Sequence, residues 1–256
     1  MTRHKPDFEL RLARDAADIR AGQRLRYAVF IEEMGGDGPL VDHAAGLERD
    51  ALDDRADHLL LFDKAAPGAP AVGAYRLMRD DMLRPGECFY SAGEFDLSPL
   101  TGSGRRLLEL GRSCVHPAYR GGPGLMRLWQ GLLDYVERHG TEVLFGVASF
   151  HGTDPAPFAP SLSLLHHRHL APPELRIRAI GENARPMDIL PEAEIDRPAA
   201  MRAVPALIRA YLRLGGYVGE GAWIDRPFNT VDVGIVVDIA EVPEKMRALY
   251  AGGGAA

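Results

Sequence analysis

The sequence has few cysteines, no excess of positive charge and no long apolar run, and each of these absences excludes a class of protein. Two cysteines among 256 residues, Cys88 and Cys114, are too few for a disulfide framework or a cysteine-based zinc site. The formal net charge of −6 argues against a general nucleic-acid binder, whose binding domain is normally basic. No segment approaches the roughly 18 consecutive apolar residues of a membrane span. The N-terminal residues also lack the apolar run of a secretory signal. We therefore expect a cytoplasmic protein with no nucleic-acid partner.

The hydrophobic pattern predicts an α/β protein. Strands are expected at 8–12, 58–63, 72–78, 107–115, 142–149 and 230–237, and helices at about 19–30, 125–140, 162–169 and 199–214. Asp15 or Asp18 is expected to cap the first helix, and Gly140 to end the second. An irregular loop rich in acids fills 35–57, and a loop of this length is more often functional than idle.

The most informative stretch is the apolar strand 107–115, which carries Glu109 and Arg112. A core strand seldom carries both, because an unpaired buried charge costs several kcal/mol. Residues three apart point to opposite faces of a regular strand, so this spacing predicts a bulge or a shared ligand. A glycine-rich turn, 116–124, and an amphipathic helix follow directly. Strand, turn and helix N-terminus together form a place where an anionic group can bind.

This order of hairpin, strand, glycine-rich turn, helix and strand resembles the GNAT acyltransferase fold. The blocks 25–30, 73–77 and 109–112, together with Asp53 and Asp57, resemble the signature of acyl-homoserine-lactone synthases. The blocks 89–97, 144–155, 219–225 and 228–233 resemble ornithine–acyl carrier protein N-acyltransferases, which begin ornithine-lipid synthesis. The resemblance spans roughly 8–250, and the combination of blocks is more specific than any one motif.

The resemblance implies a GNAT-like α/β (α+β) fold, in which helices flank a mixed, twisted sheet with two splayed parallel strands. It implies a single domain over 1–256. Its core sheet and acyl-donor site would occupy 8–150, and a family-specific C-terminal elaboration at 151–250 would complete the sheet.

The implied reaction moves a 3-hydroxyacyl group from acyl carrier protein to the α-amine of L-ornithine, by direct attack on the thioester. Three alternatives remain open: the same reaction on another amino acid, glutamine especially; a homoserine-lactone-type signal synthase; and a non-catalytic docking module for acyl carrier protein. No tightly bound cofactor is implied, since 4′-phosphopantetheine arrives on the carrier. An amphiphilic product makes peripheral contact with the inner face of the membrane reasonable.

Glu109 is the candidate base, or an orienting group for the amine; the alternative is a structural ion pair with Arg112. Backbone N–H groups at Ser113, Cys114 and Val115 are candidates to stabilise the tetrahedral oxyanion. Neither Ser113 nor Ser149 sits in a Gly-x-Ser-x-Gly nucleophile elbow, so no acyl-enzyme is expected. The Cys114 side chain is expected to be a small core residue.

The turn supplies the candidate phosphate ligands Arg120, Gly121, Gly122 and Gly124. Pro123 stands where the family motif usually has glycine, and it removes one N–H donor. The turn therefore suits the single phosphate of a carrier-borne pantetheine better than the pyrophosphate of coenzyme A. The alternative is a plain loop before a helix that starts near Pro123.

Two further groups of residues follow from the resemblance and from charge. The expected substrate and cap residues are Arg26, Phe30, Asp53, Asp57 and Arg76, and exposed ion pairs are the alternative for each charge. A positive patch for the acidic carrier protein is expected at Arg105, Arg106 and Arg127.

The acceptor should meet an arginine through its carboxylate and an acid through its side-chain ammonium. Asp154, Asp225 and Asp232 lie in family-like blocks and are candidates, with turn capping as the alternative role. His166, His167 and His169 lack a partner at metal-ligand spacing, so we expect an exposed helix face and no metal site.

Overall fold

The computed structural model describes residues 4–251, which divide into two compact units. Of these residues, the first unit contains 4–78, 110–140 and 247–251, and the second contains 79–109 and 141–246. Strand β5 (Leu107–Val115) passes from the second unit into the first. This division does not follow the expected boundary at residue 150 between a core sheet and a C-terminal elaboration. That the chain forms a single domain with two splayed strands stays a prediction.

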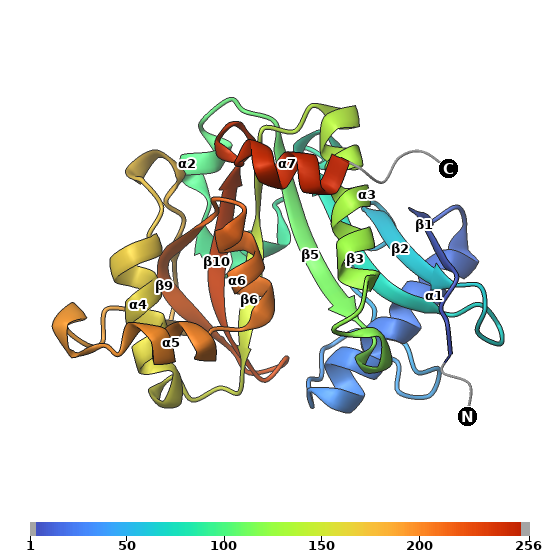
Figure 1. The fold of residues 1–256 in the computed structure, drawn as a ribbon, viewed down its shortest axis with the longest axis horizontal. Coiled ribbons are helices and arrows are strands. Elements are labelled where there is room, and N and C mark those ends of the chain that lie inside the picture. Colours follow the sequence, from blue (N-terminus) through green and yellow to red (C-terminus); the bar gives the residue numbers. More distant parts are fainter. Residues whose placement is uncertain (1–3, 252–256) are drawn as a thin grey trace. The chain divides into compact units, whose positions relative to one another are not determined.

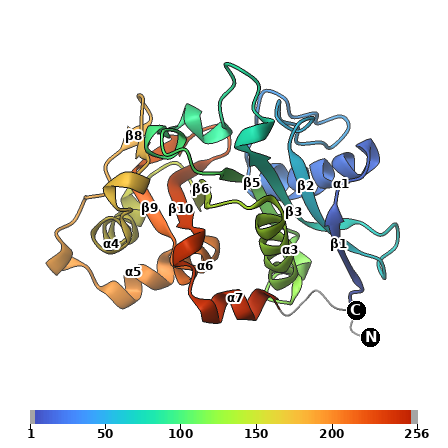
Figure 2. The same cartoon turned by 90° about the horizontal axis from the view of Figure 1, so that it is seen from above.

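The first unit is a sheet covered by a helix on each face. Its elements are β1 (Phe8–Leu12), α1 (Ala16–Arg26), a π-helical segment Tyr27–Glu33, β2 (Asp57–Asp63), β3 (Ala71–Arg79), the end of β5, and α3 (Gly124–His139). Strands β1, β2 and β3 pair antiparallel in that order. Leu60 packs with Leu25 of α1 and Val29 of the π-helical segment, whereas Leu61 faces Gly124 at the start of α3. Figure 2 shows α1 and α3 on opposite sides of these strands.

One local signal in the sequence starts α1, and another ends α3. The Asp15 carboxylate accepts the N–H groups of Ala17 and Asp18, so it is the expected N-cap, while Asp18 binds Arg11 instead. Gly140 ends α3 in the left-handed conformation at φ 61°. At Gly73 in β3, an added Cβ would lie 2.8 Å from Leu128 Cδ1, so the close approach of α3 requires glycine there.

The second unit is built on the antiparallel strands β6, β10 and β9, with β10 in the middle (Figure 1). Its elements are β4 (Phe95–Asp96), α2 (Ser98–Thr101), the start of β5, β6 (Val143–His151), α4 (Ala159–His169), β7 (Arg178–Ala179), β8 (Ala184–Arg185), α5 (Arg197–Ala203), α6 (Ala206–Arg213), β9 (Tyr217–Asp225) and β10 (Thr230–Asp238). Helix α7 (Glu244–Ala251) begins in this unit and ends in the first.

The segment 89–95 crosses one face of this sheet. The Phe89 ring meets the Phe145 ring of β6 edge-to-face, with centroids 4.9 Å apart. At the other end, an added Cβ on Gly234 of β10 would lie 3.3 Å from the Phe95 ring. The same Cβ would lie 2.6 Å from Ile177 Cδ1, so Gly234 leaves space that Ile177 and Phe95 fill together. Between these contacts lies a 3₁₀ turn, Tyr90–Gly93, which positions much of the site below.

The single helix expected at 199–214 is wrong, because two helices, α5 and α6, occupy this stretch. Val204 adopts an extended conformation at ψ 133°, since the following Pro205 disfavours the helical one. The sequence also missed β9, whose glycines and register shift against β10 disguise the strand pattern. Among residues 4–251, no helix is both long and apolar enough to cross a bilayer.

Candidate active site

Glu109 lies at the end of the second unit's part of β5, and the turn Tyr90–Gly93 holds its carboxylate. Oε2 accepts the N–H of Tyr90 at 3.0 Å, and Oε1 accepts the N–H and the hydroxyl of Ser91 at 2.7 and 2.6 Å. The residue is only 2% exposed. Three donors occupy three of about four lone-pair positions of a carboxylate. The side chain is therefore fixed and retains capacity for one more donor.

Arg112 lies three residues further along β5, at φ 51°. This left-handed conformation is uncommon for a residue other than glycine and confirms the predicted irregularity of the strand. The guanidinium forms ion pairs with Glu48 at 3.1 Å and Asp50 at 2.7 Å. Arg112 therefore pairs with Glu48 and Asp50, and Glu109 binds the turn Tyr90–Gly93. The ion pair between Glu109 and Arg112 that was the alternative is not what these contacts form.

Six charged side chains of the first unit form a buried ion network: Arg26, Arg76, Arg112, Glu48, Asp50 and Asp53. Arg26 binds Asp53 through two nitrogens, at 2.8 and 2.6 Å, and Glu48 at 2.5 Å. Arg76 binds Asp50 at 2.5 Å. Arg26 and Arg76 are each 1% exposed, so the alternative of exposed ion pairs is wrong for them. Three cations balance three anions, which makes burial of these charges tolerable.

The ion network gives the irregular 35–57 loop a fixed place. Besides Arg26, Asp53 accepts hydrogen bonds from Gln23 Nε2 at 2.9 Å and from the Asp50 N–H at 3.1 Å. The loop therefore folds onto α1 through charge and hydrogen bonds, without regular strands or helices of its own.

Asp57 and Phe30 have other surroundings. Asp57 accepts the hydroxyl of Tyr135 on α3 at 2.7 Å. Phe30 is half-buried against the apolar cluster that contains Val29 and Cys114. Of the five expected cap residues, the structure therefore brings together three: Arg26, Asp53 and Arg76. It adds two acids, Glu48 and Asp50, which the sequence showed only as members of an acidic loop.

The pKa of Asp53 links the ion network to acid stability. Burial opposes ionisation, but the hydrogen bonds and charge of Arg26, with Gln23 and Arg76, lower the pKa to about 2 from 3.8. A lowered folded-state pKa stabilises the fold above about pH 4, and this contribution is lost as the pH falls towards 2. We expect the free energy of unfolding to drop by about 2 kcal/mol over that interval from this residue alone. Urea unfolding at several pH values measures it. Asp53→Asn should flatten the profile between pH 4 and 2, and an unchanged profile would contradict the assignment.

The glycine-rich turn after β5 is anchored at two points. Arg120 forms a two-nitrogen ion pair with Glu33 at 2.6 and 2.7 Å, and its Nε donates to the carbonyl of Val115 at 2.9 Å. The Tyr119 hydroxyl donates to Asp63 at 2.9 Å. Gly121, at φ 72°, makes the bend.

Helix α3 begins directly after this turn. Pro123 precedes its first residue, Gly124, so the helix starts near Pro123, as the loop alternative predicted. Because Arg120 pairs with Glu33, its guanidinium already has a partner within the protein. Backbone N–H groups at Gly121, Gly122 and Gly124 stay the predicted phosphate donors.

Cys114 is buried in the apolar cluster of the first unit, as expected. Burial raises the pKa of its thiol to about 12. The thiol is therefore protonated at neutral pH and unsuited to attack a thioester. An oxyanion role for the N–H groups of Ser113, Cys114 and Val115 stays a prediction.

The expected positive patch is weakened at Arg105. Its guanidinium binds both carboxylate oxygens of Asp238 at 2.7 Å and so carries little free charge. The Arg106 side chain is 65% exposed, with its Nε 3.7 Å from Glu142. Arg127 is exposed on α3.

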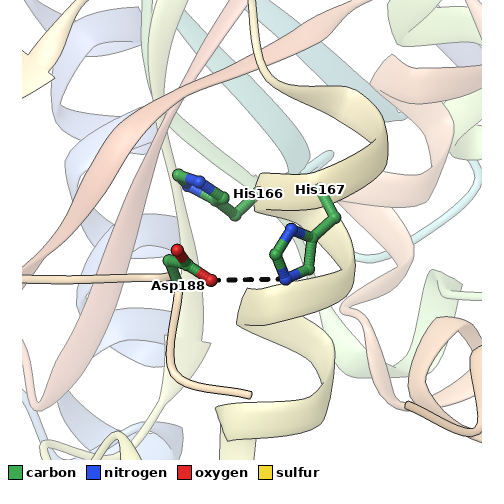
Figure 3. Close-up of side chains that lie close together, drawn as sticks. All are labelled: His166, His167 and Asp188. Atoms are coloured by element: carbon green, nitrogen blue, oxygen red, sulfur yellow. Dashed lines mark ion pairs between the residues drawn. The ribbon is translucent and has the colours of Figure 1, made fainter. Parts of the chain in front are cut away.

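Asp188 brings a carboxylate to the histidines of α4, which the sequence spacing did not reveal (Figure 3). His166, His167 and Asp188 have ligand atoms within 4.8 Å of one another. However, the Nε2 of His167 donates to the Leu190 carbonyl at 2.9 Å and lies 3.3 Å from Asp188. These contacts tie α4 to the 188–190 segment and engage the ring nitrogen that faces Asp188.

The three acids considered for the acceptor ammonium differ in burial. Asp154 is exposed and caps the N–H of Ala156 at 3.0 Å, which is the alternative role. Asp225 and Asp232 are buried and lie beside Glu94, a residue of the family-like block 89–97 that the sequence did not single out.

Known proteins align in sequence with nearly the whole of this chain. An L-ornithine N(α)-acyltransferase of Rhodobacter capsulatus is 55% identical over 246 residues, which cover 95% of this chain and 94% of that one. This chain belongs to the L-ornithine N(α)-acyltransferase family. The enzyme of the same name from Brucella abortus is 42% identical over 95% of this chain and 88% of its own.

The GNAT acetyltransferase domain matches residues 25–130 of this acyltransferase. The crystallised CoA-dependent acyl-homoserine lactone synthase MesI has a similar fold, with a TM-score of 0.51 and 14% identity over 97% of this chain and 96% of that one. These matches confirm the expected GNAT-like α/β fold. In this L-ornithine N(α)-acyltransferase family member, the ion network, Glu109 and the glycine-rich turn all lie in the GNAT region, whereas Asp225 and Asp232 lie outside it.

Proposed function

We propose that this enzyme transfers a 3-hydroxyacyl group from acyl carrier protein to the α-amine of L-ornithine, which gives a lyso-ornithine lipid. The observation that carries the proposal is the identity of 55% with the Rhodobacter capsulatus L-ornithine N(α)-acyltransferase over 95% of the chain. The fixed carboxylate of Glu109 supports it, because amide formation needs a group that orients the amine and accepts its proton.

The proposed reaction is a direct displacement. The α-amine donates an N–H to Glu109 and attacks the thioester carbon, and the carboxylate takes a proton as the C–N bond forms. N–H groups around Ser113 to Val115 stabilise the oxyanion. Collapse of the intermediate breaks the C–S bond and expels the pantetheine thiolate, which takes up the proton that Glu109 received and leaves as the thiol on the carrier. The buried thiol of Cys114, with a pKa of about 12, supports a route without a cysteine acyl-enzyme.

The carrier's 4′-phosphopantetheine is proposed to bind at the turn before α3. Gly121, Gly122 and Gly124 offer backbone N–H groups at a helix N-terminus, where a phosphate is favoured. Arg120 would join them by exchanging its Glu33 partner for the phosphate. This prosthetic group belongs to the donor, so the enzyme itself needs no resident cofactor.

Incubation with 3-hydroxyacyl carrier protein and single amino acids tests the proposal. Mass spectrometry should find acylated ornithine in excess over acylated glutamine, lysine or homoserine lactone. A preference for glutamine or for the lactone would replace the substrate assignment. Binding of the carrier without acylation of any amine would favour a docking module instead.

The exposed Arg106 is the cleaner test of the carrier-protein patch. We expect Arg106→Glu to raise KM for acyl carrier protein several-fold at low salt, with kcat unchanged, because opposite charge speeds protein association. Steady-state kinetics at two ionic strengths measures it. Glu182→Lys is a matched surface control. Reversal of Arg105 is uninformative, since it would also leave Asp238 without its ion-pair partner. An unchanged KM at low salt would remove Arg106 from the docking surface.

A further inference from the structure

Three buried acids of the second unit lie close together, one on the segment 89–95 and two on the strands β9 and β10. Carboxylate oxygens of Glu94, Asp225 and Asp232, here called the acidic cluster, lie within 4.8 Å of one another. The three residues are 3–5% exposed. Asp225 ends β9 and accepts the N–H of Phe228 at 2.9 Å, which is a turn-capping role. This capping role accounts for Asp225, but it does not explain why three carboxylates lie together.

A buried hydroxyl on the same face of the sheet gives a second, independent observation. Thr230 lies opposite Asp225 in the register of β9 and β10, and two residues before Asp232, so the three side chains share one face. Thr230 is 3% exposed, and within the described part of the chain its Oγ1 has no hydrogen-bond partner. A buried hydroxyl without a partner is costly, and it indicates a ligand that completes the site.

The chemistry of these groups favours a primary ammonium. Ionised carboxylates this close repel one another, and a cation bound among them relieves that repulsion. An ammonium offers three N–H donors and no acceptor, which suits three carboxylates. Calcium prefers about six to eight oxygen ligands, and magnesium usually keeps several waters. With one oxygen from each of its four side chains, the acidic cluster with Thr230 falls short of the calcium shell, and either ion would have to bring several waters into this buried site.

The turn Tyr90–Gly93 connects the acidic cluster to Glu109. Tyr90 and Ser91 hold the Glu109 carboxylate, and the Glu94 N–H closes the same turn on the Ser91 carbonyl at 3.1 Å. Three residues of a 3₁₀ turn rise about 6 Å. This is the order of the separation between the two amino groups of an extended 2,5-diamino acid.

We propose that Glu94, Asp225 and Asp232, with Thr230, bind the side-chain ammonium of the amino-acid acceptor and so select a diamino acid. The inference rests on the proposed function, because it takes Glu109 as the group that receives the α-amine. The acidic cluster anchors the far end of the acceptor and directs the near end towards Glu109.

L-Norvaline, which has the carbon skeleton of ornithine without the side-chain amine, is the decisive probe. Glu94→Gln and Asp232→Asn should each lower kcat/KM for ornithine on the order of 10²-fold, because each removes one partner of a buried charge pair. Activity with norvaline should change less than about two-fold. Thr230→Val, which removes only the hydroxyl, should lower the ornithine value by about ten-fold. Exposed Glu182→Gln and Asp154→Asn are the matched controls and should leave both values unchanged.

Ornithine binding without an acyl donor gives a second readout, by calorimetry and by the ligand-induced rise in Tm. The rise should occur with ornithine, be absent with norvaline, and disappear in Glu94→Gln, whose own Tm reports that it is folded. An undiminished preference for ornithine over norvaline in both variants would overturn the inference and leave the proposed function intact.

A second outcome would also overturn the inference. A Tm rise with Ca²⁺ or Mg²⁺ that Glu94→Gln abolishes, without ornithine selectivity, would make the acidic cluster a metal site. If the wild-type enzyme acylates no ornithine, the proposed function fails, and the binding comparison still decides the inference.

Discussion

Glu109→Gln is expected to lower kcat/KM for ornithine about 10³-fold, within the range typical of losing a general base. The amide cannot take the proton of the attacking amine, and it keeps the size of the carboxylate. Its NH₂ group would also face an N–H of the turn that now donates to the carboxylate, so the folded state must be checked by Tm. Initial rates with 3-hydroxyacyl carrier protein over a range of ornithine concentrations measure kcat/KM, and rapid-mix assays at saturating ornithine show whether the loss lies in the chemical step.

A pH series separates a base from a structural group. If Glu109 receives the proton, Glu109→Gln should regain activity as the pH rises towards 9, because the α-amine loses its proton unaided. Ser91→Ala is the milder control: it removes one of three hydrogen bonds and should cost about ten-fold at any pH. Full activity of Glu109→Gln at pH 7 would exclude the proton-transfer role.

Arg26→Met is expected to lower the free energy of unfolding by about 3–5 kcal/mol, the usual loss when one member of a buried ion pair is removed. The apolar side chain fills part of the space but leaves Glu48 and Asp53 without their nearest cation. Urea unfolding followed by circular dichroism measures the loss. Arg24→Met, at an exposed position of the same helix, is the matched control and should change stability by less than about 0.5 kcal/mol.

A double-mutant cycle tests whether the loss belongs to the ion network. Arg26→Met combined with Asp53→Asn should be less destabilised than the sum of the two single variants, because each already disrupts the same contact. Additive losses would mean that the two side chains stabilise the fold independently.

Periodicity predicted most elements because their apolar residues repeat at strand or helix spacing. Strands 8–12, 58–63 and 72–78 and the helix that ends at Gly140 agree with β1, β2, β3 and α3 to within about two residues. The exceptions have local causes. At 199–214 the apolar spacing continues past Pro205, but this proline ends the first of two helices. In β9, glycines interrupt the pattern by which a strand is recognised.

The site was harder to predict, because its partners are distant along the chain. Glu109 stood out as a charge in an apolar strand, but nothing local showed that Ser91 would hold it. Glu48 and Asp50 were only two of several acids in an irregular loop, and nothing nearby in the sequence showed that they would pair with Arg112 and Arg76. Charge balance among buried groups depends on tertiary contacts, and a pattern within one segment does not contain them.

The interleaving of the two units has a practical consequence for dissecting this enzyme. The backbone passes from one unit to the other after residues 78, 109, 140 and 246. No truncation at a single point can therefore yield either unit intact, and a fragment that stops at 140 would carry an orphaned piece of its neighbour. To produce the two units separately, new linkers would have to join 78 to 110 and 140 to 247 in the first unit, and 109 to 141 in the second.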